Sequence, residues 1–410
     1  MAFALGTAVF LPPFATHGLN ATGALSATGL SKGLLMASFP LAALLGYVFA
    51  GPLSDRHGRG RVLSIGILGF AFSHLLLMLC RPLGQALDLS DSAAFLMLRL
   101  MAGVFGGMIF VVANALAGDV FPARRRARAM SIVWLGIPAA LVVGVPLTSY
   151  LDRWHNQRSA GFQYWVSEPY APLALVVSLV SLFLVRRMGG AFHAAASRAT
   201  DIPERASTKP VWIGAPVISF LMPFAVLQLL ATVADHVKGE FHWSELTIGH
   251  LFLVLGLSGV AGGVLSGVYA DACGKLRFLL VAQILFAAML WILPWATPMQ
   301  FWLVSGLLSL FSAMRQGPFQ ALALSATGRS ARGAFSSVVL GAGAIGTAAG
   351  QIAGSALFDT DPGFKAIAWS SAGATLLAAL LSAAVLKEPG VTLACPSVPE
   401  GERAQEKSVT

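Results

Sequence analysis

The sequence contains few charged residues. Asp, Glu, Lys and Arg make up 11% of the 410 residues, while 56% are hydrophobic. Soluble globular domains carry roughly 25% charged residues, so this chain has too few to cover a surface that faces water. The composition excludes an ordinary cytosolic enzyme, and it argues against a nucleic-acid binder despite the formal net charge of +9. Cysteine is scarce as well. Cys80, Cys273 and Cys395 stand far apart, which excludes a disulfide framework and leaves no basis for a metal site.

Long apolar runs are abundant instead. Crossing a bilayer takes roughly 20 apolar residues in a helix, and only helices satisfy the backbone in lipid where no β alternation is present. We therefore predict an all-α membrane protein with twelve transmembrane helices, at residues 2–18, 33–50, 62–80, 94–117, 128–150, 169–187, 211–235, 248–268, 276–295, 300–325, 333–356 and 364–386. Pro12 and Pro13 interrupt the first run, which we interpret as a short or truncated helix.

The basic residues predict the orientation. Most of the 27 Lys and Arg residues fall in alternate loops, on the side that would also hold both termini. Cytoplasmic loops carry such an excess, so we expect both termini in the cytoplasm, in a bacterial inner membrane. A polar stretch divides the apolar runs. We expect an N-terminal six-helix bundle over 1–187, a cytoplasmic linker over 188–210, a C-terminal six-helix bundle over 211–387 and a disordered cytoplasmic tail over 388–410.

The two predicted bundles share a motif in the loop after their second helix. The first copy has Gly51, Asp55, Arg56, Gly58, Arg59 and Arg61, and the second has Gly267, Asp271, Gly274, Lys275 and Arg277. The matching glycines, aspartates and basic residues are all separated by the same number of residues, which indicates an internal duplication.

The first copy, the duplication and the topology together resemble the major facilitator superfamily over nearly the whole chain. A second feature resembles its twelve-helix drug/proton antiporters and sugar-efflux members: Gly136, Gly144 and Pro146 in the fifth span, although Thr148 and Ser149 replace glycines there. The resemblance implies that Asp55 meets the N-terminus of the eleventh helix near Gly333, and that a loop arginine pairs with Asp119. A carboxylate is favourable at a helix N-terminus, so these loops are candidate gating elements.

Ionisable residues inside spans are costly and usually face a cavity or a partner. The candidate cavity residues lie on the fourth, seventh and tenth spans: Arg99, Asn114, Gln228, Arg315, Gln316, Phe319 and Gln320. The resemblance implies that these helices line a central cavity. Arg99 could instead be structural. Asp235 is the candidate proton-coupling acid, and an exposed loop position is its alternative.

These observations predict a secondary transporter that works by alternating access, without a cofactor. Two arginines among the spans favour a neutral or anionic organic solute over a lipophilic cation, and we expect proton-coupled efflux by a monomer. The alternatives are an importer or uniporter of the same fold, a membrane-embedded transferase, and a sensor that transports nothing. No Gly-Lys-Ser/Thr loop follows the glycine-rich run at 340–350, so the chain alone is not an ATP-driven pump.

Overall fold

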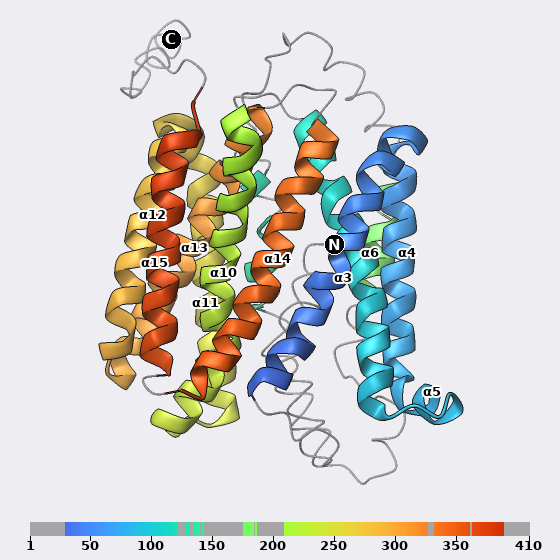
Figure 1. Cartoon of the computed structure of the whole chain (residues 1–410), viewed down its shortest axis with the longest axis horizontal. Helices are drawn as coiled ribbons and strands as arrows, with labels where there is room; N and C mark the ends of the chain where they lie inside the picture. The colour runs from blue at the N-terminus through green and yellow to red at the C-terminus, as the bar shows by residue number, and fades with distance from the viewer. Residues whose placement is uncertain are drawn as a thin grey trace, which may run out of the picture.

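The computed structural model describes residues 29–120, 175–183, 185–186, 209–326, 332–360 and 363–388, with residues 128, 130, 131, 134–139, 141 and 142 between them. Within this part of the chain all regular structure is helical (Figure 1). The predicted span 2–18, parts of 128–150 and 169–187, the linker up to residue 208 and the tail from residue 389 lie outside the described residues.

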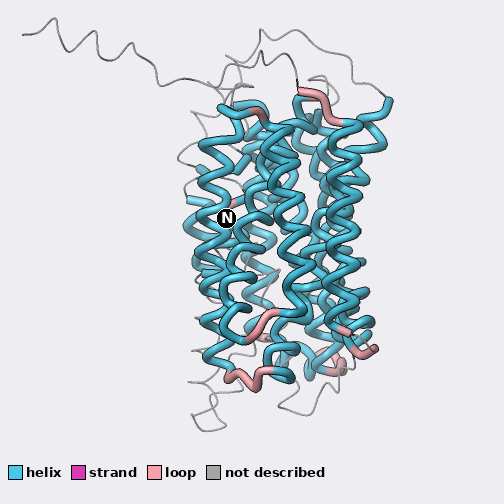
Figure 2. The backbone as a smooth tube through the Cα atoms, turned by 90° about the vertical axis from the view of Figure 1, so that its left-hand side faces the viewer, coloured by secondary structure: helices cyan, strands magenta, loops and turns pink. Residues whose placement is uncertain are grey.

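The described helices form two groups. The N-terminal group contains α3 (Gly29–His57), α4 (Arg59–Met78), α5 (Cys80–Ala86) and α6 (Asp91–Val120). The C-terminal group contains α10 (Lys209–Glu240), α11 (Glu245–Cys273), α12 (Lys275–Ile292), the 3-10 turn η2 (Leu293–Trp295), α13 (Pro298–Ser325), α14 (Arg332–Phe358) and α15 (Phe364–Val385). Figure 1 shows α14 beside α3, at the boundary between the groups, and Figure 2 shows the helices running side by side along one common direction.

Eight of the described helices are long and apolar enough to cross a membrane. Helix α13 has 28 residues but is not among the eight, because Arg315, Gln316 and Gln320 lower its hydropathy. It is nevertheless packed among them, between α11 and α12. Large apolar side chains such as Phe49, Leu303 and Leu380 are 64%, 67% and 71% exposed, as expected for surfaces in contact with lipid. The predicted all-α membrane fold is thus confirmed.

One predicted span extends two residues beyond the end of its helix. The run at 62–80 corresponds to α4, which ends at Met78, and α5 begins at Cys80. Leu79 lies between the two helices, and its N–H still bonds to Leu76 O and Leu77 O. Proline is tolerated in the first turn of a helix, where its missing N–H is not needed. Pro82 therefore suits the start of a new helix, and the sequence run alone did not reveal the break.

Rows of glycine bring helices into close contact. On α14, Gly346, Gly350 and Gly354 lie directly against the α10 backbone at Phe220, Phe224 and Gln228, where a Cβ atom would collide. On α11, Gly256, Gly259 and Gly263 likewise lie against Val142, Pro138 and Leu135 of the N-terminal group. Small residues allow such approach in membranes, where helix association depends on packing more than on the hydrophobic effect.

Candidate functional site

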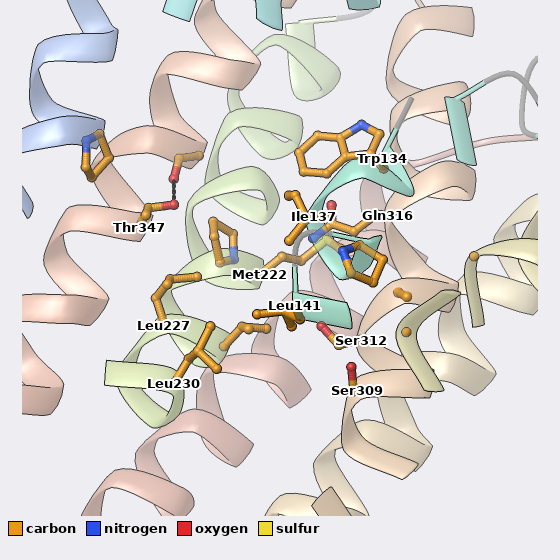
Figure 3. A pocket seen from close by; sticks show the side chains of 18 of the residues that line it. Trp134, Ile137, Leu141, Met222, Leu227, Leu230, Ser309, Ser312, Gln316 and Thr347 are labelled. Carbon is orange, nitrogen blue, oxygen red and sulfur yellow. Dashed lines mark hydrogen bonds between the residues drawn. The ribbon is translucent and has the colours of Figure 1, made fainter. Parts of the chain in front are cut away.

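A cavity of about 250 Å³ lies where the two groups of helices meet. The N-terminal group contributes α3, α6 and residues between 131 and 141, and the C-terminal group contributes α10 to α14. Most of the lining is apolar or aromatic. Figure 3 shows Trp134, Ile137 and Leu141 of the N-terminal group facing Met222 and Gln316 across the cavity. Both groups therefore have to move if the cavity is to open alternately to the two sides.

One helix contributes half of the lining residues that have a polar side-chain group. Ser305, Ser309, Ser312, Gln316 and Gln320 of α13 line the cavity, and the others, including Ser131, Ser219 and Thr347, lie on different segments. The hydroxyl of Ser309 already has an acceptor, because it donates to Leu255 O at 2.6 Å. The indole Nε1–H of Trp134 is buried without an acceptor. None of the described lining residues is Asp, Glu, Lys or Arg, so the cavity suits an apolar solute with a few hydrogen-bonding groups.

Three of the residues proposed for the cavity line it: Gln316, Phe319 and Gln320. They lie on adjacent turns of α13. Phe319 and Gln320 are 1% and 3% exposed. The four others, Arg99, Asn114, Gln228 and Arg315, are buried but are not among the lining residues.

Arg99 joins α6 to α3. Its Nε donates to Leu35 O and to Ser38 Oγ, each at 3.1 Å, and its Nη2 donates to Met36 O at 3.3 Å. The guanidinium also lies 5.8 Å from the centroid of the Phe39 ring. These contacts satisfy the charge within the N-terminal group, so the geometry favours the structural interpretation of this arginine.

Arg315 is satisfied far less well, although it is completely buried. Its Nη2 donates to Met222 O of α10 at 3.3 Å, and its Cζ lies 3.9 Å from the centroid of the Phe286 ring of α12. Nε and Nη1 have no hydrogen-bond partner in the part of the chain that the structure describes. Met222 and Phe286 both line the cavity, as does the next residue, Gln316. The guanidinium therefore lies directly behind the cavity wall.

Asn114, Gln228 and Asp235 take other positions. The amide of Asn114 donates to Phe110 O at 2.9 Å within α6. The side-chain oxygen of Gln228 accepts from Ser370 Oγ of α15 at 2.9 Å, which directs this amide away from the cavity. Asp235 is partly buried near the end of α10 and does not line the cavity.

Sequence reasoning missed several lining residues, among them Trp134, Met222, Phe286 and Thr347. Trp134 packs edge-on against Phe110, with 4.8 Å between ring centroids. Apolar residues carry no signal that separates a cavity wall from a lipid face or a packed core. Prolines inside the spans were an available hint, because Pro40, Pro138 and Pro223 all line the cavity.

The two copies of the loop motif have the same local geometry. Gly58 separates α3 from α4 with φ 89° and ψ 135°, and Gly274 separates α11 from α12 with φ 96° and ψ 122°. Residues that have a Cβ atom rarely adopt these backbone angles, which explains why glycine occupies both positions. An ion pair bridges each turn: Asp55 to Arg59 at 3.3 Å, and Asp271 to Lys275 at 2.9 Å.

Only the second copy has a described contact with the other group of helices. Asp271 Oδ2 accepts from the backbone N–H of Arg128 at 3.2 Å, and Ser131 Oγ lies 3.2 Å from Ser266 Oγ one turn further in. Gly267 of this copy also lies against Arg128 and Ser131. For the first copy, the side chain of Asp119, one of its expected partners, lies outside the described residues, and no contact between Asp55 and the start of α14 at Arg332 is among the described ones. So do Gly144 and Pro146, whereas Gly136 is buried in a helical segment.

The fold, the apolar cavity between two helix groups and the repeated loops define a membrane transporter. A family model of the Major Facilitator Superfamily matches residues 1–234 and 217–406, and the chain belongs to this superfamily. Its structure is similar to the inward-open xylose transporter XylE of Escherichia coli, with a TM-score of 0.72 and 16% identity over 95% of each chain. That likeness shows the fold alone.

Curated relatives agree with the family. The chain is 23% identical to the inner membrane transport protein YdhP of Escherichia coli over 93% of this chain and 92% of that protein. It is 26% identical to multidrug resistance protein 2 of Bacillus subtilis over 52% of this chain, and the match spans about half (51%) of that relative. The chain therefore belongs to a family of membrane transporters and not of enzymes, as the sequence predicted, and the proteins to which it is similar include a drug-resistance protein.

Proposed function

We propose that this protein exports a small neutral or anionic organic solute across a bacterial inner membrane by alternating access, in exchange for protons. The observation that carries the proposal is the cavity between the two helix groups, whose mainly apolar lining includes a polar strip on α13 and a few other polar side chains. An apolar lining with a few placed polar groups is typical of sites for drug-sized solutes. The similarity to multidrug resistance protein 2 supports export.

Alternating access requires contacts that hold one side closed and then break. The contact between Asp271 and the N–H of Arg128 is one that can form and break as the groups move. It lies at the end of the molecule where α3 meets α4 and where the described chain ends at Glu388 (Figure 1). The positive residues of these loops favour a cytoplasmic position for this end, with both termini on that side.

Proton coupling would act at a distance from the solute, because Asp235 does not line the cavity. Everted membrane vesicles provide the test, with a panel of neutral, anionic and cationic solutes and an imposed pH gradient. We expect neutral or anionic solutes to accumulate in the vesicles, and collapse of the gradient to stop accumulation. Accumulation in the absence of any gradient would indicate a uniporter, and movement out of the vesicles under the gradient would indicate an importer.

A second part of this experiment tests whether Asp235 carries the coupled proton. Asp235→Asn removes one carboxyl from α10 while keeping its size. If Asp235 carries the coupled proton, the variant exchanges solute across the membrane without responding to the gradient. A variant with unchanged gradient-driven transport removes Asp235 from the coupling mechanism.

A further inference from the structure

The buried charge of Arg315 has no counter-ion in the described part of the chain. No carboxylate there lies within ion-pair distance of it, and a guanidinium cannot lose its charge in a protein. A charge inside the membrane region is costly and is normally paired. One hydrogen bond to Met222 O and the Phe286 ring provide only part of the compensation.

The position of the unsatisfied atoms indicates where a counter-ion could bind. The N–H groups of Nε and Nη1 lack acceptors, whereas Nη2 is fixed to the carbonyl of Met222. The same Met222 extends its side chain into the cavity (Figure 3). Met222 thus contacts the guanidinium through its carbonyl and is itself part of the cavity lining, so one residue separates the guanidinium from a solute in the cavity. Methionine is unbranched and changes rotamer easily.

A comparison with Arg99 shows that this arrangement is not a general property of arginines in these spans. Arg99 donates to two carbonyls and one hydroxyl, so it needs no further anion. Gln283, which lies one turn before Phe286 on the buried face of α12, also has both amide atoms without partners. Unsatisfied polar atoms thus gather around Phe286, on the side of the cavity formed by the C-terminal group.

From this geometry we propose that Arg315 binds the carboxylate of the transported solute. The preferred substrate is then an organic monocarboxylate whose apolar body fills the cavity while its carboxylate passes Met222 to reach Nε and Nη1. This inference rests on the proposed function and narrows its substrate class from neutral or anionic to anionic. A carboxylate is the natural partner, since charge-assisted hydrogen bonds to guanidinium are among the strongest in proteins.

The experiment compares 4-phenylbutanoate with its neutral amide, 4-phenylbutanamide, which differs from it mainly in charge. Uptake into everted vesicles is measured for the wild type, Arg315→Gln and Arg315→Lys. The wild type should move the acid about tenfold faster than the amide. Arg315→Gln should bring this ratio close to one, and Arg315→Lys should give an intermediate ratio.

Lys365→Gln is the matched control. It also removes one positive charge, but Lys365 lies over the Trp295 ring, away from the cavity, so its acid-to-amide ratio should equal that of the wild type. An Arg315→Gln protein that still moves the amide and keeps the wild-type ratio overturns the inference while leaving transport intact. Failure to move these two solutes or any member of the earlier panel contradicts the proposed function as well.

A binding measurement on the purified wild type covers the case in which Arg315→Gln does not fold. The acid, but not the amide, should raise the unfolding temperature in gluconate buffer. Equal shifts for acid and amide overturn the inference. If chloride alone produces the shift and abolishes the effect of the acid, the site binds an inorganic anion, and the assignment to the carboxylate of the solute is wrong.

Discussion

The two copies of the loop motif are nearly identical in backbone and differ in their surroundings. Both turn at a glycine with positive φ, and both have an ion pair between residues four apart. The side chains of Asp55 and Arg59 are 48% and 22% exposed, whereas those of Asp271 and Lys275 are 15% and 13% exposed. The repeated sequence therefore determines the turn, and the packing around it determines what the turn can hold.

The difference arises from two partners that only the second copy has in the described structure. One is the N–H of Arg128, bound by Asp271. The other is Glu388, just after α15, whose carboxylate accepts from the N–H groups of Lys275 at 2.8 Å and Leu276 at 3.4 Å. These are free donors of the first turn of α12, and a carboxylate is favourable there. Among the described residues no acid has the equivalent position at α4.

The largest effect is expected from replacing the two turn glycines. Gly58→Ala and Gly274→Ala each place a side chain in a strained backbone, which costs about 1–3 kcal/mol. A Cβ at Gly58 would meet nothing within 4 Å, whereas one at Gly274 would lie 3.2 Å from the Glu388 carboxylate. Gly274→Ala should therefore lower the unfolding temperature in detergent more than Gly58→Ala.

A double variant tests the reason for that difference. In a Glu388→Ala background, the additional cost of Gly274→Ala should fall to the cost of Gly58→Ala, because the obstructing carboxylate is gone. If Gly274→Ala remains the more damaging of the two in that background, the contact with Glu388 is not the cause.

An intermediate effect is expected from replacing Asp55 or Asp271 by asparagine. The effect should appear in transport and not in stability. Asp271→Asn weakens a charged hydrogen bond between the helix groups. The free-energy difference between the conformations with and without this contact should change by about 1.4 kcal/mol, which lowers turnover about tenfold. Asp55→Asn should leave protein in the membrane and impair turnover less, since its described ion pair is exposed and such pairs contribute about 0–1 kcal/mol. The measurement is flux in everted vesicles per molecule inserted. A larger loss for Asp55→Asn would show that the first copy has the dominant partner.

The smallest effect is expected from Glu388→Gln. The amide keeps an acceptor for the first turn of α12 but loses the charge, so the cost should be about 0.3–1 kcal/mol. The unfolding temperature in detergent should fall slightly, and more at low than at high ionic strength. Glu388→Ala removes the side-chain carboxylate entirely and should cost more than Glu388→Gln, and an equal unfolding temperature for the two variants would contradict a capping role.

Of the residues that residue type and spacing predicted for the cavity, some line it and others do not. Gln316, Phe319 and Gln320 are on the cavity face of α13 as their helical spacing indicates. Arg99 and Arg315 occupy corresponding positions in the sequence repeat, yet Arg99 bonds to α3 and Arg315 to α10. Side-chain direction within a buried bundle depends on which neighbouring helix offers a carbonyl or a ring, and spacing along one helix does not reveal that.

The sequence by itself determined the membrane class, the helical fold, the superfamily and the repeated turn, because lipid leaves the backbone only helices and because Gly58 and Gly274 suit a backbone that other residues avoid. Only the tertiary structure decided which copy of the loop has a described contact with the other helix group, and which arginine keeps N–H groups without acceptors among the described residues. Both depend on contacts between segments far apart in the chain, such as Asp271 with Arg128 and Arg315 with Phe286. Such contacts are set by the way helices pack and not by any local pattern.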